Sequence, residues 1–284
     1  MTATSGSDTV SRQSSQSGVH SILGDPFDEI VVVLSTGRTA TKAIAHYFDR
    51  HYELVHARHE PAPSRILRLA SNLYLAGRIS HQSLRWLLVR CRRRMLADIR
   101  EPIYLETNPF LHGCLEVLEE VFGRVRVWHI VRHPGRQVTS YINFGVFDGL
   151  KGIAGSYLPF WLHKPEHSPE TLSPSWNAMA ETDRLAWRWN SINGHLNRGE
   201  QLFPGRYSRV KYEELFTPAA PAIEQLARSL GLEPTPQSTA DAFQTRIHAS
   251  HRPLCPPWED WEDEPRQRLL DHCEDLMRLY GYEA

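Results

Sequence analysis

The feature that most constrains the fold is a short apolar run near the N-terminus. The segment Asp28–Ser35 contains the consecutive residues I-V-V-V-L, a run of strand length that is far too short to cross a membrane. Strands that are apolar on both faces are typical of parallel sheets, because helices cover such sheets on both sides. The run therefore predicts a central strand of a parallel sheet.

Further segments of strand length alternate with helical segments along the chain. Four more strands are expected, at Tyr52–Ala57, Ile103–Glu106, Val125–Val131 and Tyr207–Lys211. Apolar residues recur at helical spacing in the intervening and final segments, which are Thr39–Arg50, Leu115–Phe122, Leu185–Leu196, Ile223–Leu230 and Leu269–Tyr280. Alternation of this kind favours an α/β fold with a central parallel sheet flanked by helices.

We expect one domain over residues 25–284, preceded by a disordered tail over residues 1–24. The tail is rich in Ser, Thr, Gln and Gly and lacks the apolar core of a signal peptide. Residues 62–100 are predicted to form a mainly helical insertion between two strands. Residues 145–176 are rich in glycine, proline and aromatic residues. Because this segment is longer than an ordinary connection between two elements, it is predicted to form a lid or an acceptor-binding loop.

Composition excludes several classes of protein. Charged residues make up 23% of the chain and the net charge is −1, which argues against a mainly disordered chain. No apolar run approaches the roughly 18 residues of a transmembrane helix. The four cysteines are widely spaced and lack a C-x-x-C pair, which argues against a structural zinc site or a disulfide framework. We expect a cytoplasmic globular protein.

Charge is distributed unevenly along the chain. Ten arginines lie between Arg58 and Arg100, together with Glu60 and Asp98, and an acidic run lies near the C-terminus at residues 259–264. Two interpretations stay open: the two segments are solvated faces that pair with each other, or the basic segment contacts an anionic ligand or surface. We predict that the basic segment forms an acceptor-side wall or an interface, for example in a homodimer. Nucleic acid is not an expected partner.

Polar side chains follow the predicted strands at their carboxyl ends. In open α/β sheets, ligands bind beyond this edge. The segments to inspect are Ser35–Lys42, His59–Pro61, Glu106–Pro109, Arg132–Pro134 and Tyr212–Glu214. We therefore expect an active site where these segments meet.

The loop Ser35–Lys42, with the sequence S-T-G-R-T-A-T-K, is the most informative of them. It places hydroxyls, a glycine and two cations between a buried strand and a helix, where backbone N–H groups and the helix N-terminus receive phosphate groups. It is not a Walker A loop, because G-x-x-x-x-G-K-[ST] is absent. The strand Val125–Val131 also lacks a terminal Asp to hold Mg²⁺.

A second signal follows the strand Val125–Val131. Arg132-His133-Pro134 is followed by Ser140 in the pattern R-x7-S, which spans a strand end and a helix start. An arginine and a hydroxyl placed in this way could clamp a second phosphate. Alone, the pair is more typical of a surface arginine and a helical serine.

Together and in this order, the two signals resemble the sulfotransferases that use 3′-phosphoadenosine 5′-phosphosulfate (PAPS). Arg38-Thr39-Ala40-Thr41 is similar to their 5′-phosphosulfate loop R-[ST]-G-[ST], with alanine in place of glycine, and Arg132 with Ser140 is similar to their 3′-phosphate motif. Tyr207–Leu215 resembles their later Y-E-D-L strand end, and Leu279–Tyr282 resembles their final L-G-Y. The resemblance spans about residues 28–282.

The resemblance implies a P-loop-NTPase-like three-layer sandwich with a helical insertion. It implies transfer of a sulfuryl group from PAPS to a hydroxyl or amine of a carbohydrate, glycolipid or other small molecule, with release of adenosine 3′,5′-bisphosphate (PAP) and no requirement for a metal. Arg38 and Lys42 are implied to neutralise the leaving phosphate. The residues implied to bind the donor are Thr36, Gly37, Arg38, Thr39, Ala40, Thr41, Lys42, Arg132, Ser140, Ser250 and Arg252.

Three residues are candidates for the general base that activates the acceptor. Glu60, in H-E-P, lies where carbohydrate-type members of the family carry Glu-Pro, and His59 beside it titrates nearer to neutral pH. Glu106 heads the segment E-T-N-P-F after the third strand. Each of the three could instead pair with a nearby arginine.

Two further alternatives stay open. An ATP-dependent P-loop kinase acting on a small molecule is the alternative function, and it would depend on Mg²⁺. Five aromatic residues either line an acceptor pocket or pack in the core or lid, namely Phe144, Phe147, Tyr157, Phe160 and Trp161.

Overall fold

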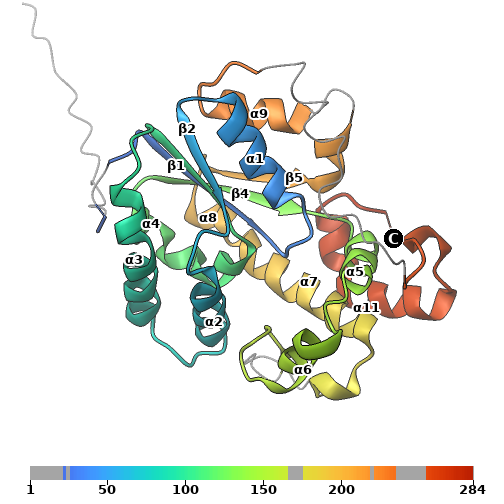
Figure 1. The fold of residues 1–284 in the computed structure, drawn as a ribbon. Coiled ribbons are helices and arrows are strands. Elements are labelled where there is room, and N and C mark those ends of the chain that lie inside the picture. Colours follow the sequence, from blue (N-terminus) through green and yellow to red (C-terminus); the bar gives the residue numbers. More distant parts are fainter. Residues whose placement is uncertain (1–21, 24–25, 166–174, 218–220, 235–253, 284) are drawn as a thin grey trace, which may run out of the picture.

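The computed structural model describes residues 22–23, 26–165, 175–217, 221–234 and 254–283. Its centre is a parallel sheet of five strands in the order β2-β3-β1-β4-β5, with helices on both sides (Figure 1). The predicted α/β fold is confirmed. The strands are β1 (Glu29–Ser35), β2 (Val55–His59), β3 (Ile103–Thr107), β4 (Val125–Val131) and β5 (Tyr207–Lys211).

The apolar run I-V-V-V-L lies in β1, the middle strand of the sheet. All of its residues after Glu29 are buried. Side chains alternate along a strand, so Ile30 and Val32 pack in one core cluster while Val31 and Val33 pack in another. A strand buried on both faces requires a helical layer on each side.

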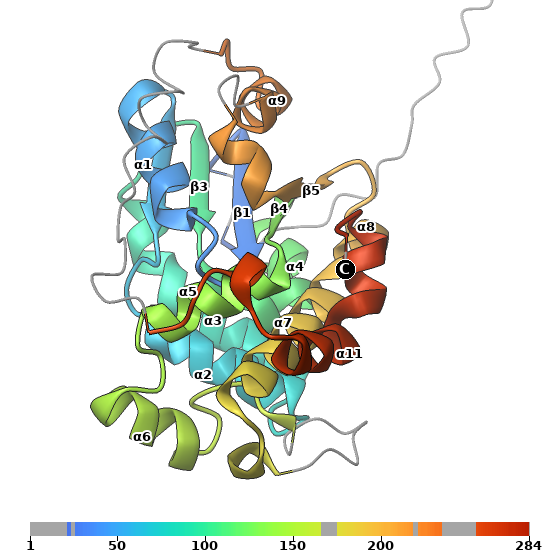
Figure 2. The same ribbon diagram turned by 90° about the vertical axis from the view of Figure 1, so that its right-hand side faces the viewer.

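Two helical layers meet this requirement. Figures 1 and 2 show α9 above the strands and α2 and α7 below them, and Figure 2 shows α1 beside β3. The first layer consists of α1 (Thr41–His51) and α9 (Pro221–Ser229). The second consists of α2 (Ser64–Leu75), α3 (His81–Ala97), the 3₁₀ helix η1 (Pro109–Val117), α4 (Leu118–Phe122) and α7 (Glu181–Asn197).

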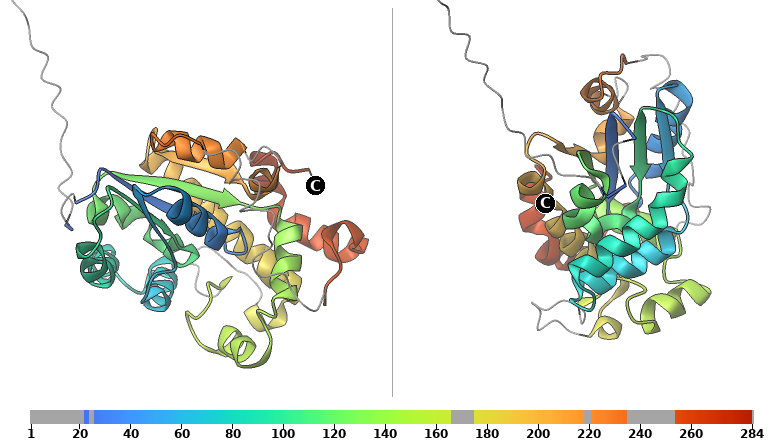
Figure 3. Two further views of the ribbon diagram at one scale, coloured as in Figure 1. Left: turned by 45° about the horizontal axis from the view of Figure 1, so that its top comes forward. Right: turned by 90° about the vertical axis from the view of Figure 1, so that its left-hand side faces the viewer.

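A third apolar cluster lies beyond the carboxyl end of β4. Val131 packs there with residues of α5 (Pro134–Asn143), α7 and α11 (Asp263–Leu279). Figure 3 shows α5 and α11 at the end toward which the strand arrows point. The remaining short helices are α6 (Gly149–Tyr157), α8 (Gly199–Leu202), η3 (Trp176–Ala178), η4 (Tyr212–Phe216) and η5 (Trp258–Asp260).

Residues 62–100 form α2 and α3, and a buried ion pair joins α3 to the sheet. Arg92 and Glu106 are both fully buried, and Arg92 Nε and Nη2 donate to the two carboxylate oxygens of Glu106 at 2.8 and 2.6 Å. Tyr104 and Asn108 donate to the same carboxylate at 2.9 and 2.8 Å. Charge-assisted hydrogen bonds of this number offset the cost of removing both ions from water.

The second strand begins at Val55 rather than at the predicted Tyr52. Tyr52 instead ends α1, because its backbone N–H donates to the carbonyl oxygen of Phe48 at 3.2 Å and its ring stacks on the Phe48 ring. The strand is therefore displaced toward His59, which moves Glu60 to the first position after it.

The helix predicted over Leu115–Phe122 is divided into the end of η1 and the five-residue α4. Pro109 begins η1, and a Cβ at Gly113 would lie 2.6 Å from the carbonyl oxygen of Ser71. η1 therefore lies directly against α2, and a side chain at position 113 would separate them. No helix within the described ranges is long and apolar enough to cross a bilayer.

Glu106→Gln should destabilise the protein by about 3 kcal/mol, because it leaves the Arg92 guanidinium buried without its counter-ion. Urea unfolding followed by circular dichroism measures the change. The double variant Arg92→Met/Glu106→Leu should lose less stability than the two single changes combined, since it removes both charges. A change of less than about 0.5 kcal/mol in Glu106→Gln would contradict this role.

Candidate active site

The loop between β1 and α1 curls back on itself at the carboxyl edge of the sheet. Ser35 Oγ accepts hydrogen bonds from Gly37 N at 3.1 Å and from Thr39 Oγ1 at 2.8 Å. Gly37, Arg38 and Ala40 have φ angles of 87°, 57° and 58°. Alanine rarely adopts this left-handed conformation, which explains why glycine is usual at the position that Ala40 occupies in the resembling motif.

α5 fastens this loop through two side chains. Gln137 Nε2 donates to Thr36 Oγ1 and, at 2.7 Å, to the carbonyl oxygen of Gly37. Tyr141 Oη donates to the carbonyl oxygen of Thr36. A Cβ at position 37 would lie 2.3 Å from Tyr141 Oη, so glycine permits the close approach. The loop and α5 meet because β1 and β4 are neighbours in the sheet.

The two sequence motifs meet at Arg38. Arg38 Nε donates to Ser140 Oγ at 3.2 Å, and the guanidinium lies over the Phe144 ring, 4.5 Å from its centroid. Arg132 Nη1 donates to the carbonyl oxygen of Arg38 at 2.9 Å. Arg38, Arg132 and Ser140 therefore lie together, although they are far apart in the sequence.

Arg132 presents an unsatisfied donor at this point. Its guanidinium lies over the Tyr212 ring, 4.1 Å from the centroid. Burial lowers the pKa of Arg132, and this effect is opposed by Tyr212 and Glu213. Its Nε is buried without a hydrogen-bond partner among the described residues. Since buried polar groups are normally hydrogen-bonded, this donor suits a bound anion.

Glu213 and Tyr282 hold the start of α5 in position. His133 N, at the start of α5, donates to Glu213 Oε1 at 3.1 Å, and Tyr282 Oη donates to Glu213 Oε2 at 2.8 Å. A carboxylate at this point also complements the positive end of the helix dipole. The Tyr212-Glu213 pair and Tyr282 therefore act together, by covering Arg132 and by fixing α5.

Glu60 and His59 lie at the end of β2, and both side chains are partly exposed. His59 Nδ1 is 3.0 Å from Thr107 Oγ1, and His59 Nε2 is 3.6 Å from Glu60 Oε1. Glu60 has a φ of 45°. Burial raises the pKa of its carboxyl group, and the charge of Arg68 opposes this rise. Strained backbone and raised pKa values are typical of functional sites.

Glu106, the third candidate base, lies in the core. Its carboxylate is fully buried and is occupied by Arg92, Tyr104 and Asn108. It therefore has no exposed oxygen that could take a proton from an acceptor. We correct the expectation for Glu106 accordingly and assign it a structural role, because β3 directs this side chain toward α3.

The other predicted site residues are distributed as follows. Thr36, Thr39 and Thr41 are buried in the loop and at the start of α1, while Lys42 is exposed on the first turn of α1. Ser250 and Arg252 lie outside the described residues. In the part of the chain that the structure describes, no group of three or more His, Cys, Asp or Glu side chains could hold a metal ion.

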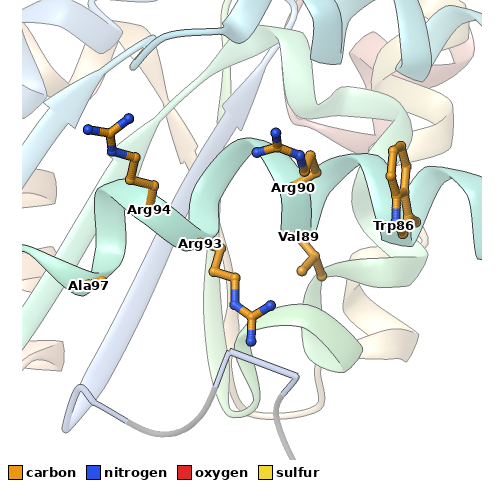
Figure 4. Close-up of a pocket in the computed structure, with 6 residues that line it drawn as sticks. All are labelled: Trp86, Val89, Arg90, Arg93, Arg94 and Ala97. Atoms are coloured by element: carbon orange, nitrogen blue, oxygen red, sulfur yellow. The ribbon is translucent and has the colours of Figure 1, made fainter.

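The arginines of the basic segment lie in different surroundings. Arg92 is buried, and Arg85 pairs with Glu120 of α4 at 3.1 Å, before the start of β4. Figure 4 shows an exposed tryptophan and three arginines spread along α3: Trp86, Arg90, Arg93 and Arg94. Arg68, in contrast, lies close enough to Glu60 for its charge to oppose the rise that burial causes in the pKa of that carboxyl group.

The acidic run near the C-terminus pairs within its own neighbourhood. Glu259 lies 2.7 Å from Arg136 of α5, and Glu264 lies 2.6 Å from Arg268 of α11. Among the ion pairs of the described ranges, none joins residues 259–264 to the basic segment. The interpretation in which the two segments pair with each other is therefore wrong for the residues described.

Sequence reasoning missed Gln137, Tyr141 and Arg188. Gln137, Ser140 and Tyr141 have the i, i+3, i+4 spacing of one helical face, so the position of Ser140 is a signal that could have identified its two neighbours. Arg188 of α7 lies close enough to Tyr141 for its charge to oppose the rise that burial causes in the pKa of that hydroxyl. It carries no local signal, because its position depends on how α7 packs against α5.

No family model matches the chain, and no curated protein matches its sequence. Solved structures match its fold. A sulfotransferase domain from the curacin biosynthetic pathway has a TM-score of 0.54 at 14% identity, covering 90% of this chain and 98% of that one. A sulfotransferase from Alicyclobacillus acidocaldarius has a TM-score of 0.51 at 12% identity, covering 89% and 96%. The chain has the fold of these sulfotransferases.

Ala40→Gly should leave stability unchanged or raise it by up to about 1 kcal/mol, because relief of the left-handed strain outweighs the added freedom of the unfolded chain. Urea unfolding measures the change. The matched control is Ala43→Gly inside α1, which should lose about 1 kcal/mol. Equal losses in the two variants would show that Ala40 is not strained.

Proposed function

We propose that this chain, which has a sulfotransferase fold, transfers a sulfuryl group from PAPS to a hydroxyl or amine of a carbohydrate, glycolipid or other small molecule. The observation that carries the proposal is the meeting of Arg38, Arg132 and Ser140 at one point of the sheet edge. Two guanidinium groups and a hydroxyl gathered beside a helix N-terminus suit a ligand with two separate phosphate groups.

The residues present fit such a donor. The buried Nε of Arg132 lacks a partner among the described residues, and it would be satisfied, together with Ser140 Oγ, by the 3′-phosphate. The Thr36–Thr41 loop and the start of α1 would receive the 5′-phosphosulfate. Ser250 and Arg252 stay predictions for the 3′-phosphate.

The chemistry needs positioning and charge stabilisation more than a reactive protein group. PAPS supplies the sulfuryl group and a phosphate leaving group when bound. Arg38 lies where its positive charge would stabilise the leaving phosphate, and α5 fixes the loop that carries it. Lys42 is a second cation for this role, on the exposed first turn of α1.

Glu60 is the favoured general base. Burial raises the pKa of its carboxyl group above the ordinary 4.5, which makes the carboxylate a better proton acceptor while leaving it available at neutral pH. His59 contacts both Thr107 and Glu60, so it would orient the carboxylate. His59 remains the alternative base.

Arg132→Met should weaken the binding of PAP by about tenfold or more, because it removes charged hydrogen bonds to phosphate. Isothermal titration calorimetry without metal measures the affinity. The matched control is Arg136→Met, which removes an exposed arginine paired with Glu259 and should leave the affinity unchanged. Binding of ATP with Mg²⁺ in preference to PAP would contradict the proposal and support a kinase.

Glu60→Gln should lower kcat by about 100-fold or more while leaving PAP affinity intact, as expected for loss of a general base. The base acts in its deprotonated form, so kcat/KM of the wild type should fall as pH falls through the pKa of Glu60, and burial places this acid limb above pH 4.5. The assay follows sulfation of a panel of hydroxyl acceptors across pH. Undiminished turnover in Glu60→Gln would transfer the role to His59.

A further inference from the structure

Two arginines approach Glu60 and Tyr141 from helices that do not carry the donor motifs. Arg68 belongs to α2 and influences the pKa of Glu60. Arg188 belongs to α7, and its charge opposes the rise that burial causes in the pKa of Tyr141, whose hydroxyl donates to the carbonyl oxygen of Thr36 in the loop. One arginine therefore lies close to the candidate base, and the other lies close to the tyrosine that fastens the β1–α1 loop.

Arg68 is held by aromatic rings rather than by a carboxylate. Its guanidinium lies 3.9 Å from the centroid of Trp161 and 5.1 Å from that of Phe110. Arg68 has no hydrogen bond or ion pair with any described residue. Ring faces hold a guanidinium in place and supply no oxygen to its N–H groups. The donors of Arg68 thus remain available for a ligand.

Arg188 also has no carboxylate partner among the described residues. Its Nε is buried and has no hydrogen-bond partner in the described ranges. Its positive charge lowers the pKa values of both Arg68 and His112, together with the larger effect of burial at each. The two guanidinium groups are therefore near each other, and neither forms an ion pair with a described carboxylate.

The charges at this point do not balance. Arg68 and Arg188 carry two positive charges, and the nearby carboxylate is Glu60, which acts as the base in the proposed reaction. Half-buried charges without a partner are costly, and proteins normally pair them. An anionic group on a ligand would supply the missing partner, and guanidinium groups suit carboxylate and sulfate oxygens in particular.

We propose that Arg68 and Arg188 bind an anionic oxygen group, a carboxylate or a sulfate ester, on the acceptor. This inference rests on the proposed sulfotransferase activity. The acceptors are then acidic molecules that present a hydroxyl or amine to Glu60 while their anionic group contacts the two arginines. The ring faces of Trp161 and Phe110 hold the guanidinium of Arg68 in place.

The test is a calorimetric titration of the PAP-saturated protein with matched pairs of probes. One pair is methyl glucuronide and methyl glucoside, and a second is 4-hydroxybenzoate and 4-hydroxybenzyl alcohol. A third pair compares glucose 6-sulfate with glucose, which separates sulfate esters from carboxylates. In at least one pair the acid should bind about tenfold tighter or better, and Arg68→Met and Arg188→Met should each remove most of this preference.

Controls separate this role from folding and from donor binding. Arg94→Met, on the outer face of α3, should keep the full preference for acids. Arg68→Lys and Arg188→Lys keep the charge and should restore part of the preference, with thermal unfolding confirming that each variant folds. PAP affinity should be unchanged in the Arg68 variants.

Three outcomes would overturn the inference. Equal binding of acid and neutral probes by the wild type would show that no acceptor anion site exists, and PAP binding would still support the proposed function. Loss of PAP affinity in Arg68→Met would assign the arginines to the donor. Absence of PAP binding to the wild type would remove the proposed function itself, and the titrations repeated without PAP would then show whether the arginines bind acids independently.

Discussion

The attachment of the β1–α1 loop to α5 is the interaction on which the whole site depends. Gln137 and Tyr141 bind the backbone of Thr36 and Gly37, and Arg132 binds the carbonyl oxygen of Arg38. These contacts exist because β1 and β4 pair directly in the sheet. They fix a loop that contains three left-handed residues and that would otherwise have many alternative conformations. The same contacts bring the arginine of each motif to one point.

A second constraint acts on the opposite side of β1, where the helices that bring Arg68 to the site are anchored. The buried pair of Arg92 and Glu106 ties α3 to β3, and Gly113 allows η1 to lie against α2. This packing places Arg68 between two aromatic rings beside Glu60. The core of the insertion therefore fixes the position of Arg68 relative to Glu60.

The sequence predicted those features that depend on local pattern. β1 follows from a continuous apolar run, β4 and β5 follow from short strand-like segments between helical ones, and Arg38, Arg132 and Ser140 follow from motifs that are compact in sequence. The second strand was displaced because Tyr52 packs on Phe48 as the end of α1. The role of Glu106 and the position of Arg188 could not be predicted, since each depends on which distant helix packs against it.

The most direct test of this account is a crystal structure of the protein bound to PAP. The account predicts the 3′-phosphate on Arg132 and Ser140 and the 5′-phosphate within the loop from Thr36 to Lys42, with Glu60 facing the 5′ end. Density for PAP elsewhere on the protein, or a 3′-phosphate remote from Arg132, would contradict the assignment of this sheet edge as a sulfotransferase site.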